Sequence, residues 1–476
     1  MPLLLSCTAA MALAWALTIY KGWFVWSAMV PLTLAVLLAV AAALAGRSYP
    51  SGKPLATKFA YLSMALGTVV SLIWHFRFST EVLYGSSLGP TLHWLHVFAI
   101  VPVVIHVLSP PRIKTVLFVV LLFIFAVTGC IVIHARPSPA IDTWYFQQAG
   151  AQWLSQGGNP YDAAYTIPYA PWQIDVFYGQ GVVENGYLMS YGYPPLNLFV
   201  QLPFLAILGD IRYSILFGVL LSALFIRGLA PARHRALADM AALFLMFEPA
   251  TLFVVRQAWT EPIVLAFWSA ALLAAKKALP EAAARASNKS RWLSGIALGL
   301  LAAIKQYTPL ILIPPLLQTA MHKRPKQQIL IATACACITI VPFLLWNPYE
   351  FLRDIVFLQF KQPFRLDALS VLAAIARLRH VPSLPATALL PAFLVPWLIF
   401  IVAKPKPGRI DQIALTTAAG FITFIFLNKQ SFHNYYWLAL GLLCATCAAS
   451  STKTDVANDH GPHSSVRNPH PMGLDL

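Results

Sequence analysis

Acidic and aromatic residues gather between residues 135 and 193, where four of the seventeen carboxylates of the chain lie. The first acid, Asp142, directly follows an apolar run and opens a segment in which Trp144, Gln148 and Ala151 share helical spacing. An acid in this position, beside aromatic rings, suits a general base that removes a proton from a substrate. The same position fits a helix N-cap equally well.

Cations that could hold an anionic group are few outside the short basic loops. Lys305 interrupts an otherwise apolar run, where an unpaired charge is costly; it is therefore expected to bind phosphate, or else to extend toward the membrane surface. Arg256, Gln257 and Glu261 flank a short turn, and the two charges there either pair with each other or contact a ligand. Glu184 is the second candidate base.

A second polar cluster, LNKQSFHNYYWLAL, precedes the last apolar run. His433 could donate a hydrogen bond to a phosphate or serve only in packing. No group of acids, histidines and cysteines has the spacing of a metal site, so the sequence predicts neither metal nor cofactor, and it leaves a divalent-metal requirement open. The candidate ligands in this cluster are Lys429, His433, Asn434 and Tyr435.

The composition shows what kind of chain must position these residues. Of 476 residues, 59% are hydrophobic and only 11% charged, whereas about a quarter of residues in soluble domains carry a charge. This excludes a soluble enzyme and a disordered scaffold. The net charge of +16 comes from lysines and arginines in short loops, which is typical of cytoplasmic loops and not of a nucleic-acid site. The sequence predicts an all-α, polytopic membrane protein.

Apolar runs of about 20 residues predict membrane-spanning helices. Lys305 and Pro309 divide one long run, which is expected to form two short helices in a hairpin. With Tyr193 outside and the basic Arg227 inside, the chain between them must cross the membrane once or three times, yet two apolar runs are present. The topology of 194–236 is therefore left open. About 12 to 14 spans are predicted, from runs at 3–20, 23–45, 57–76, 93–108, 115–134, 194–209, 212–227, 237–255, 260–275, 292–320, 329–346, 384–403, 411–427 and 434–450.

Three parts are predicted along the chain. Residues 1–112 form an N-terminal transmembrane bundle of uncertain role, residues 113–450 carry the candidate site, and residues 451–476 form a disordered cytoplasmic tail. The basic loops place 135–193 on the non-cytoplasmic side, as a long loop with short interfacial helices.

The order of these features resembles a known family. An apolar span, Asp142, an amphipathic segment, GGNPYD, an aromatic loop and YPPL at Tyr193 follow in the order seen in glycosyltransferase family 87, the polyprenol-phosphate-mannose-dependent mannosyltransferases of the GT-C superfamily. The resemblance covers roughly residues 115–450. KQYTP is similar to the family's Lys-x-x-Pro, here Lys305 to Pro309 with one extra residue, and the cluster before the last span is also similar.

The resemblance implies a membrane glycosyltransferase of the cell envelope, in a bacterial-type inner membrane. It would move mannose or a similar hexose or pentose from a polyprenyl-phosphate carrier to a lipid or glycan acceptor on the non-cytoplasmic face. Asp142 would deprotonate the acceptor hydroxyl, and cations would hold the phosphate. Arg256 and Gln257 lie where the family often has Gly-Gln, and this difference leaves the identity of the donor sugar open.

Two other classes also fit a polytopic chain with polar residues near its spans: a transporter, and a lipid-linked glycan flippase or ligase. A transporter usually places its polar residues near the middle of the membrane. Here they are expected at one face, which favours the transferase.

Overall fold

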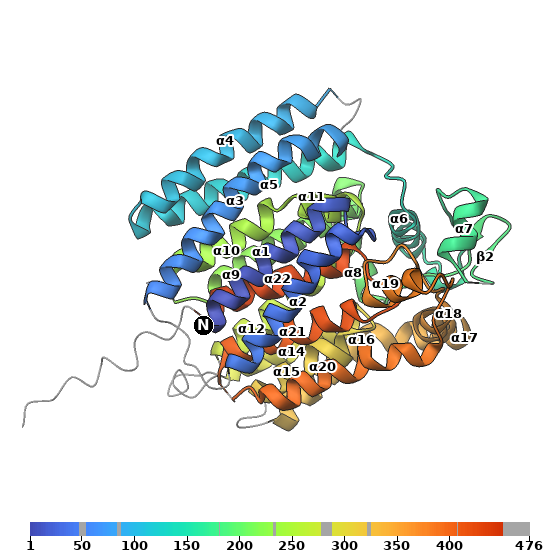
Figure 1. The fold of residues 1–476 in the computed structure, drawn as a ribbon. Helices are drawn as coiled ribbons and strands as arrows, with labels where there is room; N and C mark the ends of the chain where they lie inside the picture. Colours follow the sequence, from blue (N-terminus) through green and yellow to red (C-terminus); the bar gives the residue numbers. More distant parts are fainter. Residues whose placement is uncertain are drawn as a thin grey trace, which may run out of the picture.

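The protein is an all-α helical bundle, as the sequence predicts (Figure 1). Helices are the expected solution for such apolar segments, since a backbone in lipid must satisfy its own hydrogen bonds. The predicted tail 451–476 and the basic loop segments 47–53, 278–287 and 321–324 lie outside the described residues. The computed structural model describes residues 1–46, 54–82, 87–179, 181–231, 235–277, 288–320, 325–406 and 408–450.

Within the described ranges, seven helical segments are long and apolar enough to cross a membrane, and two bent helix pairs raise this number to nine. The seven are α1 (Pro2–Tyr20), α2 (Trp26–Gly46), α3 (Pro54–Val82), α4 (Gly89–Leu108), α5 (Pro111–Ala135), α16 (Pro325–Trp346), and η5 (Ala386–Leu389) together with α20 (Leu390–Ala403). The bundle is completed by α12 (Glu261–Lys277), α14 (Asn288–Ile304), α21 (Ile410–Phe426) and α22 (His433–Ser450).

Two helix pairs are sharply bent, and one of them lies in the 194–236 segment. Helices α8 (Leu196–Leu208) and α9 (Arg212–Gly228) meet at an angle of 114°. Gly209 ends α8 with a φ of 75°, a conformation that glycine adopts without steric cost. A bend of this size occurs in a broken span and in a re-entrant segment alike, so the number of crossings in 194–236 stays open. The other pair, α10 (Arg235–Phe247) and α11 (Pro249–Arg256), bends by 54°.

The long apolar run at 292–320 is broken at Lys305, as expected. Helix α14 ends at Ile304, and a π-helical turn, η3 (Thr308–Leu312), leads into α15 (Ile313–Ala320). Pro309 has no N–H to donate, which favours a break at this point. Helix α15 packs back against α14 and also contacts α21.

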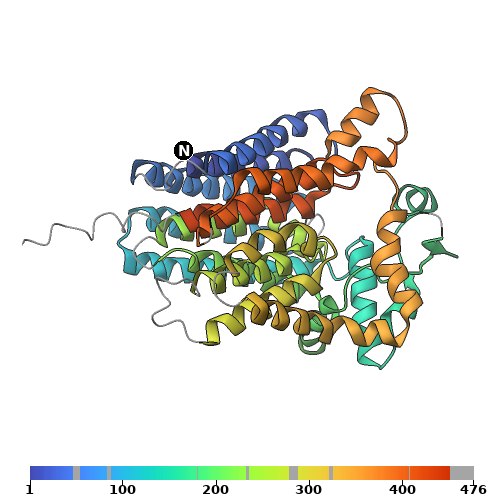
Figure 2. The same ribbon diagram turned by 90° about the horizontal axis from the view of Figure 1, so that it is seen from below.

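Short elements gather at one end of the bundle, called the loop end below, on the right in Figures 1 and 2. The 135–193 segment supplies a small antiparallel sheet of order β1-β3-β2 and two α-helices. Its elements are α6 (Asp142–Ser155), η1 (Pro160–Asp162), β1 (Tyr165–Thr166), α7 (Pro171–Phe177), β2 (Val183–Glu184) and β3 (Tyr187–Leu188). The later loop adds α17 (Pro348–Leu352), η4 (Arg353–Phe357), α18 (Leu358–Lys361) and α19 (Val371–Leu378).

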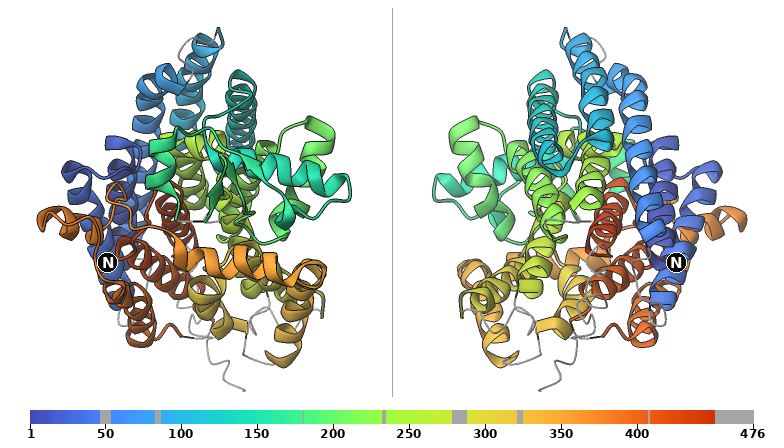
Figure 3. Two further views of the ribbon diagram at one scale, coloured as in Figure 1. Left: turned by 90° about the vertical axis from the view of Figure 1, so that its right-hand side faces the viewer. Right: turned by 90° about the vertical axis from the view of Figure 1, so that its left-hand side faces the viewer.

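The first five helices divide between two places. Helices α1 and α2 pack against α22 and α21 inside the bundle. Helix α4 lies outermost on one side and packs on α3 and α5, which in turn contact α10 and α11 of the bundle (Figure 3). The division predicted at residue 112 stays a prediction.

Candidate active site

Asp142 lies at the loop end as the first residue of α6. The N-cap is Ile141, so Asp142 does not cap the helix in the usual way; its Oδ1 accepts a hydrogen bond from the adjacent Thr143 N at 2.7 Å. Two phenols also donate to the carboxylate, Tyr169 to Oδ1 at 3.2 Å and Tyr178 to Oδ2 through a short hydrogen bond. The carboxylate is therefore surrounded by hydroxyl donors.

Helix α6 is held to two turns of the bundle. Thr143 Oγ1 donates to Gln257 O at 2.8 Å, and Gln147 Nε2 donates to Ala258 O at 2.9 Å, which anchors α6 on the α11–α12 turn. Gln148 Nε2 donates to Gly209 O at 2.9 Å, on the α8–α9 turn. These bonds come from three residues of the first two turns of α6, so they fix the position of Asp142 on the bundle.

Lys305 forms a buried ion pair with Glu261. The distance from Lys305 Nζ to Glu261 Oε1 is 2.8 Å, and the two side chains are 3% and 0% exposed. Lys305 therefore does not extend toward the membrane surface, and Glu261 pairs with it instead of with Arg256. Glu261 Oε2 is buried and has no hydrogen-bond partner among the residues that the structure describes.

Two amides position Lys305 next to the 192–197 segment. Asn197 Nδ2 donates to Ile304 O at 2.6 Å, and Gln306 Nε2 donates to Gly192 O at 2.8 Å. The predicted YPPL turn thus meets the break in the long apolar run. Three aromatic rings surround the ammonium group, with centroids 4.3, 5.7 and 6.0 Å from Nζ, and they belong to Tyr193, Tyr435 and Tyr307.

Tyr193 lies between the two charged centres. Its ring contacts Lys305 on one side and, at 5.2 Å between centroids, Phe146 of α6 on the other. Burial raises the pKa of the Tyr193 hydroxyl well above its ordinary value, and the charges of Glu261 and Asp142 raise it further. Tyr193 therefore links Lys305 to helix α6, the helix that Asp142 opens.

A second ion pair, Arg365 with Asp367, lies near Asp142. Arg365 binds both carboxylate oxygens of Asp367, at 2.7 and 2.6 Å, and packs over the rings of Phe177 and Phe432. Burial raises the pKa of Asp142 above its ordinary value; hydrogen bonds from Tyr178, Thr143 and Tyr169 and the charge of Arg365 oppose this rise.

The other predicted ligands also lie at the loop end, but they contact residues other than Asp142 and Lys305. His433 is 2% exposed and packs against Phe253 and Trp259, with its backbone and Cβ against Gly22. A Cβ at Gly22 would approach His433 to 2.7 Å. These are packing contacts, and the predicted phosphate contact of His433 stays a prediction.

Four further candidates differ in burial. Arg256 is half-buried, and within the described part of the chain its Nε has no hydrogen-bond partner. Lys429 Nζ donates to Gln362 O. Asn434 is buried on α22 beside Tyr435, and Glu184 is exposed on β2.

The sequence prediction missed three contact residues of the site. Tyr169 and Tyr178 bind Asp142, and Tyr307 OH donates to Glu261 Oε1 at 3.4 Å. The only signal for the first two was the high tyrosine content of the 135–193 segment. In the parts of the chain that the structure describes, no group of three or more His, Cys, Asp or Glu residues could hold a metal ion.

No protein-family model and no curated protein matches the chain. Two solved structures are similar to it, those of ArnT from Cupriavidus metallidurans in the apo state and bound to undecaprenyl phosphate. Their sequence identities are 14% and 13%, and the TM-score is 0.44 for both. The matches cover 71% of this chain but only 59% and 60% of ArnT. A similarity of this size assigns no activity to the chain.

Proposed function

We propose that this protein is a membrane glycosyltransferase that moves a sugar from a polyprenyl-phosphate carrier to an acceptor hydroxyl. The observation that carries the proposal is that Tyr193 joins the buried cation Lys305 to helix α6, which begins with the carboxylate of Asp142, at one end of a helical membrane bundle. A transfer between two membrane-bound substrates needs both groups at the level where the lipid headgroups lie.

Asp142 is suited to the base. A hydroxyl already donates to each of its oxygens, and an acceptor hydroxyl would donate in the place of Tyr178 or Tyr169. Asp142 takes the proton as the acceptor oxygen attacks the anomeric carbon, and the bond from that carbon to the phosphate oxygen breaks. The carrier leaves as a phosphate monoester, a stable anion that needs a cation more than a proton donor.

Lys305 is the cation that we assign to this phosphate. Its ammonium group forms an ion pair with Glu261 and also contacts the ring of Tyr193, which packs on α6. A lysine ammonium has three N–H donors, so it can bind a phosphate oxygen while keeping one bond to Glu261.

The distribution of basic residues supports a site on the non-cytoplasmic face. Helices α12 and α21 carry cations at the end away from the loop end, Lys276 and Lys277 on α12 and Arg409 next to α21, whereas α9 has an arginine at each end. Such residues favour the cytoplasmic side. Mannose, or a similar hexose or pentose, and a lipid or glycan acceptor of the cell envelope remain the proposed substrates.

The test is transfer of labelled sugar by the purified protein in detergent or liposomes, from a polyprenyl-phosphate-sugar donor. We expect a covalent product and release of the polyprenyl phosphate. Movement of the donor across liposomes without a covalent product would support the transporter or flippase alternative and overturn the proposal.

The pH dependence of transfer gives a second prediction. The base must be ionised, so kcat/KM should fall as the pH drops through the raised pKa of Asp142, above the value of about 3.9 for a free aspartate. Tyr178→Phe removes a hydrogen bond that favours the ionised form, so the acid limb should move to higher pH. Tyr169→Phe, which removes a longer bond, should move it less. An acid limb unchanged in Tyr178→Phe would contradict the assignment of the base.

A further inference from the structure

The segment that brings two phenols to Asp142 is itself weakly anchored. Residues 169–179, called the strap below, contain helix α7, which has no buried residue. Tyr169 and Tyr178 flank this helix, and their hydroxyl groups donate to the Asp142 carboxylate. Because α7 buries no side chain, the positions of the two hydroxyl groups depend on contacts at the ends of the strap.

Arg365 provides such a contact. It is 7% exposed, and its guanidinium carbon lies 4.2 Å from the ring centroid of Phe177 and 4.9 Å from that of Phe432. Phe177 precedes Tyr178 in the chain and packs on Tyr169, at 5.0 Å between ring centroids. Through Phe177, the guanidinium is thus connected to both residues that bind the Asp142 carboxylate. Arg365 and the two phenylalanines are called the arginine clamp below.

The turn between α1 and α2 fixes the other side of the clamp. Asp367, the ion-pair partner of the clamp arginine, accepts a hydrogen bond at its backbone O from Phe24 N, at 3.0 Å. The next residue, Ala368, forms an isolated β-bridge with Trp23. The Trp23 ring also packs on Phe432, at 5.9 Å between centroids. Two N-terminal helices far from Asp142 in the chain therefore help to shape its surroundings.

The clamp also brings a positive charge to the base. The titratable groups that interact with Asp142 are the Arg365 guanidinium and the phenols of Tyr169, Tyr178 and Tyr193. Burial raises the pKa of each phenol above its ordinary value, so the three phenols are neutral at acid and neutral pH. Of these four groups, only the guanidinium carries a positive charge that favours the ionised carboxylate.

We propose that Arg365 is a positioning residue for the base, which holds Tyr178 on Asp142 and keeps that carboxylate ionised. The inference rests on the proposed function, because it takes Asp142 as the base. Two nitrogens of the guanidinium already bind the Asp367 carboxylate, so we assign Arg365 to the base and not to the phosphate. The α1–α2 turn belongs to the site by the same contacts.

Arg365→Gln tests the proposal through the pH profile. Loss of the charge should move the acid limb of kcat/KM up by about one pH unit, the lower end of the effect of a neighbouring opposite charge. On that limb, kcat/KM should then fall about tenfold. Arg365→Lys keeps the charge and should bring the limb part of the way back. An equal loss in both variants at every pH, with the limb unmoved, would overturn the proposal.

A double-mutant cycle tests whether Arg365 acts through Tyr178. Tyr178→Phe should also move the acid limb to higher pH, and independent effects would add in the double variant. If the clamp holds Tyr178 on the base, the limb of Arg365→Gln, Tyr178→Phe should move by less than the sum of the two single shifts. Full additivity would overturn the link through Tyr178.

Hydrogen exchange separates this inference from the proposed function, because it requires no sugar transfer. Tyr178 N donates to Ile174 O at 3.0 Å, so its exchange reports on the end of the strap. We expect peptides from 169–179 to exchange about tenfold faster in Arg365→Gln, as the strap loses its cation–π contact. Phe177→Leu, which leaves the buried ion pair intact, should have the same effect even where loss of the arginine damages the fold.

The two proposals then fail in different ways. Faster exchange in these variants, with no transfer by the native protein, would support the clamp and contradict the transferase. Transfer by the native protein, with unchanged exchange in both variants, would overturn the clamp alone.

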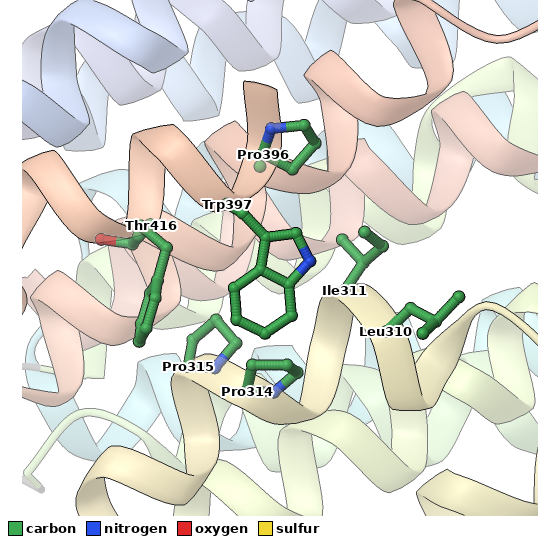
Figure 4. A pocket seen from close by; sticks show the side chains of 9 residues that line it. Leu310, Ile311, Pro314, Pro315, Pro396, Trp397 and Thr416 are labelled. Carbon is green, nitrogen blue, oxygen red and sulfur yellow. The ribbon is translucent and has the colours of Figure 1, made fainter. Parts of the chain in front are cut away.

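Two controls complete the experiment. Arg379→Gln removes an exposed arginine at the end of α19. Trp397→Leu removes an aromatic ring from an apolar crevice between η3–α15 and helices α20 and α21, whose lining includes no residue of the clamp (Figure 4). Neither should change the exchange of the strap. An equal increase in either control would overturn the proposal, since it would indicate a general loosening of the protein.

Discussion

Asp142→Asn is expected to lower sugar transfer by roughly a hundred- to ten-thousand-fold, the range that general-base catalysis commonly contributes. Asn keeps the size and the acceptor oxygen of the native side chain, so Tyr169 or Tyr178 can still donate to it. What it loses is the charge that takes the proton from the acceptor. The measurement is the single-turnover rate of transfer at saturating donor, compared with the native protein in the same detergent.

Asp175→Asn is the control for this substitution. Asp175 belongs to the same loop and lies exposed on α7, so its variant should transfer sugar at the native rate. Thermal unfolding should show that both variants are as stable as the native protein. Native activity in Asp142→Asn would remove Asp142 from the mechanism, with Glu184 left as the other candidate base in the segment.

Lys305→Met is expected to abolish transfer and also to destabilise the protein by about 3–5 kcal/mol, because it leaves the buried carboxylate of Glu261 without its cation. Loss of activity in this variant alone is therefore ambiguous, since a damaged fold would also be inactive. Thermal unfolding in detergent measures the first effect, and binding of a radiolabelled polyprenyl phosphate measures the loss of the phosphate ligand.

The double variant Lys305→Met, Glu261→Gln resolves the ambiguity. It removes both charges, so most of the lost stability should return, while phosphate binding and transfer should stay lost. Lys361→Met, which removes an exposed lysine at the same end of the bundle, should change neither. Recovery of transfer in the double variant would show that Lys305 has only a structural role.

The pairing of Lys305 with Glu261 has a consequence for binding. Without a ligand, the pair is neutral, and the cost of burying the lysine charge is partly offset by the carboxylate. A phosphate that approaches Lys305 also approaches Glu261, so the site balances attraction to one group against repulsion from the other. Glu261→Gln alone should therefore bind polyprenyl phosphate more tightly than the native protein does.

The sequence by itself determined the class of protein and much of its local structure. Hydropathy and the short basic loops predict the helical membrane bundle, because lipid forces each apolar run to satisfy its own hydrogen bonds. The break at Lys305 and the start of α6 at Asp142 were also predictable, since proline and the end of an apolar run act on neighbouring residues. These features depend on short stretches of chain.

Only the tertiary structure decided which side chains meet. Lys305 and Glu261 are 44 residues apart, and Tyr178 and Asp142 are 36 apart. Arg256 is far closer to Glu261 along the chain, and pairing between them was the natural expectation, yet the packing of α12 against α14 brings Lys305 to Glu261 instead. The packing of one helix against another determines such partners, and the spacing of residues along a single segment does not predict that packing.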